Sequence, residues 1–214
     1  MIVDIERDLA AEQEYASRLC VIGSFPRSGS HWTRRMLAEI IARRNNLESG
    51  AAFGVALNRL AGFTQPFEEK FWKTFEGPIF VAAHNLNEFG RDFLKIYLRR
   101  NFEAVWRSTQ KAQKEMATCW WGGTRDECHD KWSRHVEDGC TSARVVIDYE
   151  VTRTDPATTV KVICGAIGLE VTDAEVAAAV QAGSRENMLT EQSLHCPHRD
   201  WDIVNTQTNQ HHES

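Results

Sequence analysis

Short apolar runs alternate with longer amphipathic stretches along most of the chain. Each run is four to eight residues long and is bounded by polar or turn-forming residues, which is typical of a buried strand. The first run stops at Pro26, as expected where a strand enters a loop. The predicted strands are residues 18–25, 78–83, 94–98 and 144–147.

The stretches between these runs have helical spacing. In residues 30–44 the apolar side chains share one face, and the four arginines of the segment mostly occupy the other. Asp155 before Pro156 is a helix-start signal, and Thr172 with Glu175 has the spacing of a capping box. The predicted helices are residues 30–44, 102–116, 126–136, 156–168 and 172–182.

Strands that alternate with helices predict an α/β fold, in which a mostly parallel central sheet is flanked by helices. In such folds, ligands bind beyond the carboxyl ends of the strands. The length of 214 residues fits a single domain covering residues 1–214, with a polar tail at about 205–214 that we expect to be flexible.

Charge and composition narrow the function classes. The chain has 25 basic and 30 acidic residues, a net charge of −5 and a pI near 5.9, which disfavours nucleic acid as a partner. We expect no membrane span, because no apolar run approaches the roughly 20 residues that a bilayer requires. The acidic N-terminal segment and six scattered cysteines favour a cytoplasmic protein with reduced thiols.

The loop after the first predicted strand is a candidate anion site. It leads into a helix N-terminus, where backbone N–H groups and the helix dipole attract negative charge. Gly29 permits close approach of a ligand, Arg27 adds a permanent charge, and Trp32 offers a flat face for a base. Ser28 and Ser30 add hydroxyl donors.

This loop differs from the loop that binds nucleoside triphosphates. Five residues separate Gly23 from Gly29, where that motif has four. Ser30 follows Gly29, where that motif has the phosphate-binding lysine. ATP and GTP are therefore disfavoured, and a nucleotide or metabolite kinase of related fold is the second hypothesis.

Residues 25–32 (FPRSGSHW) resemble the 5′-phosphosulfate loop of the sulfotransferases that use 3′-phosphoadenosine-5′-phosphosulfate (PAPS). They match at every position except His31, where the family usually has Thr or Ser. A second block, residues 96–101 (IYLRRN), resembles the family strand that ends in R-N-P, with Arg100 and Ser108 at the family's spacing. The resemblance implies that this pair binds the 3′-phosphate of PAPS.

Two further blocks resemble the same family and run in the same order. Residues 80–86 (FVAAHNL) resemble the strand that ends in the catalytic histidine, which implies that His84 is the general base. Residues 146–168 resemble the Y-E-D-L stretch and the segments after it, which implies that Tyr149 contacts the adenine. The blocks cover about residues 19–170.

The resemblance implies a PAPS-dependent sulfotransferase that transfers a sulfuryl group and releases adenosine 3′,5′-bisphosphate (PAP). Arg27 would stabilise the leaving phosphate, and His84 would accept the acceptor's proton. The loop residues of the PAPS site would be Arg27, Ser28, Gly29, Ser30, His31 and Trp32. The third hypothesis is a non-catalytic protein that binds an adenosine bisphosphate.

Several features stay open at this level. The acceptor would be a small molecule or a glycan that attacks the sulfur through a hydroxyl or an amine, and the oligomeric state is unknown. The family's C-terminal R-K-G segment has no clear counterpart, although Arg199 and Trp201 lie in a suitable place. We expect no metal, because neither the Cys128–Cys140 group nor the His195–His198 group has familiar zinc-ligand spacing.

Overall fold

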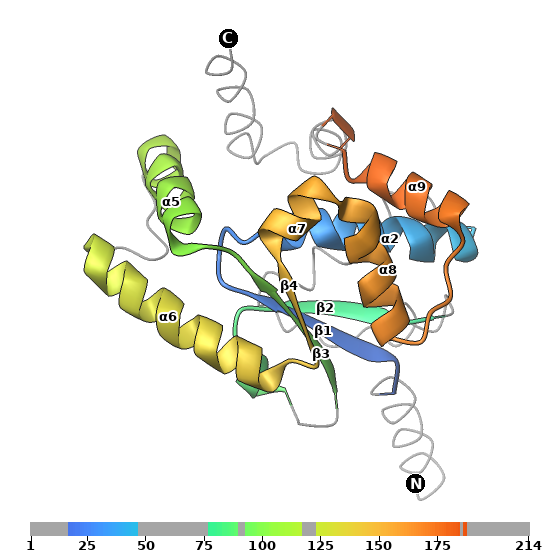
Figure 1. Cartoon of the computed structure of the whole chain (residues 1–214), viewed down its shortest axis with the longest axis horizontal. Coiled ribbons are helices and arrows are strands. Elements are labelled where there is room, and N and C mark those ends of the chain that lie inside the picture. The colour runs from blue at the N-terminus through green and yellow to red at the C-terminus, as the bar shows by residue number, and fades with distance from the viewer. Residues whose placement is uncertain (1–16, 47–76, 90–92, 117–122, 185, 188–214) are drawn as a thin grey trace, which may run out of the picture.

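The computed structural model describes residues 17–46, 77–89, 93–116, 123–184 and 186–187. Within these residues the chain alternates between strands and helices (Figure 1). In chain order the elements are β1 (Leu19–Ser24), α2 (Ser30–Arg44), β2 (Ile79–Ala83), the 3-10 helix η2 (Leu86–Glu88), β3 (Leu94–Arg99), α5 (Phe102–Met116), α6 (Arg125–Ser142), β4 (Val145–Asp148), α7 (Tyr149–Thr154), α8 (Pro156–Ala166) and α9 (Asp173–Ala182).

The four strands form one parallel sheet in the order β2-β1-β3-β4. The chain therefore passes from β1 to the neighbour on one side, and then crosses to β3 on the other side. This change of direction is a topological switch point, and it leaves a crevice beyond the carboxyl end of β1. The segments that follow β1, β2 and β3 all meet there.

The two faces of the sheet bury different sets of side chains, because successive strand residues point to opposite sides. On one face, side chains such as Ile22 and Ile96 pack against α2, α8 and α9. On the other face, Val21 and Tyr97 pack against η2 and α6. Figure 1 shows α2, α8 and α9 together on one side of the sheet and α6 on the opposite side.

The predicted α/β class with a parallel sheet is confirmed, and each predicted strand agrees with an observed strand to within one residue at each end. The helices expected at residues 30–44 and 102–116 have those bounds. Asp155 caps α8 by accepting a hydrogen bond from the Thr158 amide, and the capping box of Thr172 and Glu175 opens α9.

Three expectations from the sequence need correction. The helix expected at 126–136 extends over residues 125–142, because Thr124 and Glu127 form a capping box that sets its start. The short helix α7 was not expected. Arg34 and Arg35 are buried, at 1% exposure each, although the amphipathic pattern placed the arginines of α2 mostly on the polar face.

The tail at about 205–214 and the residues Arg199 and Trp201 lie outside the described residues. In the part of the chain that is described, no helix combines the length and the apolar character that crossing a membrane requires.

Candidate active site

The loop between β1 and α2 has an unusual backbone. Arg27 has φ 68° and Gly29 has φ 86°, so two of its residues adopt the left-handed conformation. Gly29 is also the N-cap residue of α2, so no side chain caps the helix at that position. The Ser28 hydroxyl is buried and has no hydrogen-bond partner among the described residues. The loop therefore presents uncommitted donors at a helix N-terminus, which suits an anion.

Only glycine fits at position 29. A Cβ atom there would lie 2.4 Å from Cδ2 and 2.6 Å from Cε2 of Tyr149, far inside van der Waals contact. Tyr149 is the first residue of α7, so this contact brings the start of that helix against the loop. The absence of a side chain at Gly29 is what allows the aromatic ring to lie there.

Two arginines and a serine from three different elements meet beside this loop. Arg27 donates from Nε to Ser108 Oγ on α5, over 3.0 Å. Arg100, which follows β3, donates from Nη1 to the Arg27 carbonyl oxygen, over 2.7 Å. Burial lowers the pKa of Arg100, and the nearby charge of Arg27 acts in the same direction. Two guanidinium groups held together in this way favour an anionic ligand.

Aromatic rings line one side of the same cluster. The Arg100 guanidinium carbon lies 4.2 Å from the centroid of the Tyr149 ring, which is cation–π geometry. Trp32 on α2 meets Tyr149 edge to face, with 6.1 Å between ring centroids. The Nε atom of Arg100 is buried and has no partner in the described part of the chain.

His84 lies beyond β2 on the other side of β1. Its Nδ1 is 3.0 Å from the Ser24 carbonyl oxygen, at the end of β1. Because a carbonyl oxygen only accepts, Nδ1 must carry the proton, which leaves Nε2 with a free lone pair in the neutral ring. The side chain is exposed. This tautomer is the one that a general base at Nε2 requires.

Comparison with known proteins gives structural matches only. Mouse sulfotransferase SULT7A1 complexed with PAP matches 81% of this chain and 66% of its own, at 19% identity and a TM-score of 0.50. Retinol dehydratase matches 82% of this chain and 67% of its own in a complex with retinol and PAP, at 12% identity and a TM-score of 0.56. The same enzyme with androsterone and PAP gives 13% identity and a TM-score of 0.52 over 83% and 67%. No family model and no curated protein matches the chain.

The chain has a sulfotransferase-like fold. It spans about two thirds of the length of these solved structures.

The sulfotransferase-like fold brings most of the predicted site residues together. Contacts join Arg27, Arg100, Ser108, Tyr149 and Trp32 into one cluster, and Ser24 links the β1 end to His84. Ser30 and His31 occupy the first turn of α2, where His31 is exposed. Glu103, the acid three residues after Arg100, forms an ion pair with Arg125 and not with Arg100.

A second histidine, on α6, forms a hydrogen bond with the backbone of His84. His135 on α6 hydrogen-bonds through Nε2 to the His84 carbonyl oxygen and through Nδ1 to the Tyr97 hydroxyl, the latter over 2.7 Å. Burial lowers the pKa of His135, so the ring is neutral at neutral pH. Neutral His135 therefore donates to the carbonyl from Nε2 and accepts from Tyr97. This contact between His135 and the His84 segment was not identified from the sequence.

Trp132 on α6 has a comparable role at the other end of the site. Its indole N–H donates to the Arg100 carbonyl oxygen over 3.1 Å, and its ring packs on Phe102. In the described part of the chain, no group of three or more His, Cys, Asp or Glu side chains has the arrangement of a metal site. His195, Cys196 and His198 lie outside that part.

Proposed function

We propose that the protein is a PAPS-dependent sulfotransferase, which transfers a sulfuryl group to a hydroxyl or an amine of a small-molecule or glycan acceptor and releases PAP. The observation that carries this proposal is the cluster of Arg27, Arg100, Ser108 and Tyr149 around a loop at the switch point of the sheet. The resemblance of the sequence motifs implies a contact with PAPS for each of these residues. The PAP complexes among the similar structures support the same donor.

The residues present fit a nucleotide with two anionic groups. Buried polar atoms without partners, Ser28 Oγ and Arg100 Nε, are rare unless a ligand or water completes them. The 5′-phosphosulfate would lie at the loop, against Arg27 and the α2 N-terminus. The 3′-phosphate would be bound by Arg100 and Ser108, and the adenine by Trp32 and Tyr149.

Arg27 would stabilise the leaving group. In sulfuryl transfer the acceptor oxygen or nitrogen forms a bond to sulfur while the bond from sulfur to the bridging phosphate oxygen breaks. The bridging oxygen gains negative charge, and a positioned donor at such an atom contributes about 3–4 kcal/mol to catalysis. An arginine is too weak an acid to protonate the leaving oxygen, so its role is electrostatic.

His84 would remove the acceptor's proton. Its Nδ1 proton is held by the Ser24 carbonyl, so Nε2 is the atom that receives the proton during attack on sulfur. Bases of this type contribute about 10²–10⁴-fold to the rate. His135 keeps the His84 segment in place through the backbone carbonyl, and is therefore a positioning residue.

Transfer of radiolabelled sulfuryl from PAPS to a panel of phenols, alcohols, amines and sugars tests the proposal. Wild-type protein should label at least one acceptor class. His84→Ala should lower turnover by about 10²–10⁴-fold while PAP binding is retained, because the base is not part of the nucleotide site.

His129→Ala is the matched control, because His129 is an exposed α6 histidine that packs on Phe102. It should keep wild-type turnover. Full turnover by His84→Ala would contradict the assignment of the base. PAP binding without transfer to any acceptor class would favour the non-catalytic hypothesis.

A further inference from the structure

Arg34 is a buried arginine whose charge has no counterpart in the described part of the chain. It lies one turn into α2, with 1% of its surface exposed. Its Nε donates to the Ser30 carbonyl oxygen over 3.0 Å, and neither Nη1 nor Nη2 has a hydrogen-bond partner there. The neighbouring Arg35 is equally buried but pairs with Glu39 over 3.1 Å.

An unpaired guanidinium is an exceptional group to bury. Buried charges in proteins are nearly always paired, since removing them from water is unfavourable. Burial lowers the pKa of Arg34 to about 9, which still leaves the side chain charged at neutral pH. Such a group is accounted for if an anion that is not among the described residues completes it.

The position of Arg34 follows from the geometry of α2 and β2. Ile41 lies two turns further along the same helix face, and its Cδ1 atom is 3.6 Å from the place of a Cβ on Gly77, just before β2. Arg34 is therefore about 10 Å nearer the start of α2. The axis of α2 is antiparallel to the strands. A displacement toward the start of α2 is therefore a displacement toward the carboxyl end of β2, which rises about 3.3 Å per residue.

The side chain continues in the same direction. Its Nε donates to the Ser30 carbonyl oxygen, which lies about 4 Å nearer the start of α2 than the Arg34 Cα, since helical carbonyls point toward the helix C-terminus. Together the two displacements span about four residues of β2, which brings the guanidinium level with the last residues of that strand. His84 is the residue that follows β2.

We propose that Arg34 forms a buried oxyanion subsite that binds a carboxylate of the acceptor. With Nε committed to Ser30, the two Nη groups remain, and together they match the two oxygens of one carboxylate. The anion site stands on the geometry of Arg34, whereas its assignment to the acceptor rests on the proposed function.

Acetate is the probe for the subsite, with chloride at equal ionic strength as the reference. Thermal unfolding is measured with and without saturating PAP for the wild type, Arg34→Met and Arg43→Met. Arg43→Met is the matched control because this substitution removes the same charge from an exposed position on α2. Acetate should stabilise the wild type and Arg43→Met, and should bind at least tenfold more weakly to Arg34→Met.

An equal response of the wild type and Arg34→Met to acetate would overturn the subsite. Arg34→Gln provides the same comparison if the methionine variant does not fold. A missing shift with PAP would count against the proposed function and would leave the acetate comparison intact.

The assignment to the acceptor is tested on PAP-saturated protein with 4-hydroxyphenylacetate and its primary amide. The acid should raise the unfolding temperature of the wild type more than the amide does, and Arg34→Met should lose this preference. An equal response of the wild type to both compounds, including none to either, would contradict the assignment.

Discussion

At the level of single residues, the conformation of the loop is maintained by contacts from other elements. Arg27 has left-handed backbone, which costs a residue with a Cβ about 1–2 kcal/mol. Ser108 accepts from its side chain and Arg100 donates to its carbonyl, and both hold the residue in place. Strain of this kind is concentrated at functional sites, where surrounding contacts maintain it.

Gly29→Ala should destabilise the protein more than a glycine change with the same backbone demand. Gly29 has φ 86° and a Cβ there would meet the Tyr149 ring at 2.4 Å, whereas Gly168 has φ 70° and nothing within 4 Å. Gly168→Ala should cost about 1 kcal/mol through backbone strain, and Gly29→Ala about 1–3 kcal/mol more. Urea unfolding measures both, and equal losses would show that Tyr149 does not pack on the loop.

Arg100→Met should weaken PAP binding by about tenfold to a hundredfold, because hydrogen bonds to a charged group contribute about 1.5–3 kcal/mol. Binding of AMP, which has no 3′-phosphate, should change little. Arg99→Met is the control, since the adjacent Arg99 pairs with Asp148 over 2.6 Å and 2.9 Å and does not enter the cluster. Calorimetric titration measures the affinities of the wild type and both variants for PAP and AMP. An equal loss of affinity for PAP and AMP would show that Arg100 does not bind the 3′-phosphate.

Sequence reasoning found the residues of this cluster because they lie in contiguous motifs on the loop, after β3 and on α5. It did not find the role of His135, which reaches His84 from a helix 51 positions away. It also placed Arg34 and Arg35 in an arginine-rich polar pattern. Their burial depends on what packs against α2, which helical periodicity alone does not contain.

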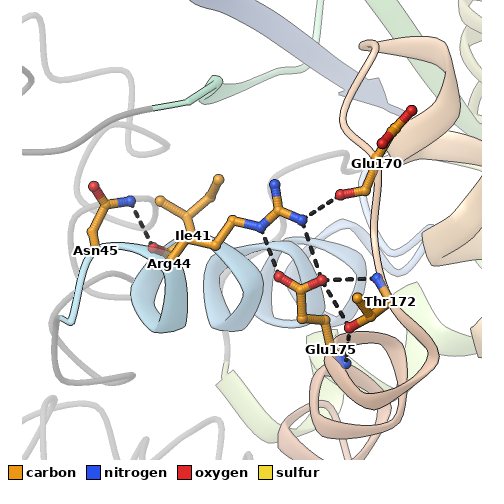
Figure 2. Close-up of polar contacts among 6 residues, drawn as sticks. All are labelled: Ile41, Arg44, Asn45, Glu170, Thr172 and Glu175. Carbon is orange, nitrogen blue, oxygen red and sulfur yellow. Dashed lines mark hydrogen bonds and ion pairs between the residues drawn. The ribbon is translucent and has the colours of Figure 1, made fainter.

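At the level of elements, one carboxylate joins α2 to α9 (Figure 2). Glu175 accepts from Arg44 Nε over 2.7 Å and from the Thr172 amide over 2.8 Å, so the same side chain closes the capping box and an interhelical ion pair. Arg44 also donates to the Glu170 carbonyl oxygen. The hydrogen bonds that Glu175 accepts lower its pKa from 4.5 to about 2, with the bond from Arg44 as the largest cause and the bonds from Thr172 as smaller ones.

Acid should remove this stabilisation. Because the pKa of Glu175 is lower in the folded state, its contribution is complete above about pH 4.5 and disappears as the pH falls toward 2. Glu175→Gln should therefore cost about 1 kcal/mol at neutral pH, and the difference from wild type should shrink below about pH 4.5. Urea unfolding across this range measures it.

Asp173→Asn is the control, since Asp173 forms an exposed pair with Lys161 at the same end of α9. Its effect should be smaller at every pH. A loss in Glu175→Gln that does not depend on pH would contradict the role of the ionised carboxylate.

Most elements were predictable because local signals and hydrophobic spacing agree, as at Asp155 and at the Thr172–Glu175 box. The start of α6 was displaced by one residue and its end by six. Its exposed final turns, which carry Glu137 and Asp138, have little apolar content, and their packing on η2 is a tertiary effect. Helix α7 is too short for periodicity to reveal it.

At the level of the whole molecule, the order of the strands determines where the candidate site residues lie. Because β1 lies between β2 and β3, the residues after three strands meet at the carboxyl end of the sheet: the loop at Arg27, the proposed base at His84 and the phosphate-binding candidate at Arg100. The alternation of strands and helices predicted the parallel sheet. The order of strands within it depends on long-range pairing, and only the structure provides it.

The most direct test of the account is the binding of PAP, ATP with magnesium, and AMP, measured by thermal unfolding. PAP should give a clear shift, since a ligand at 100 times its Kd adds about 2.7 kcal/mol to stability. ATP with magnesium and AMP should give little or none. A shift with ATP and none with PAP would contradict the PAPS site and would favour a kinase.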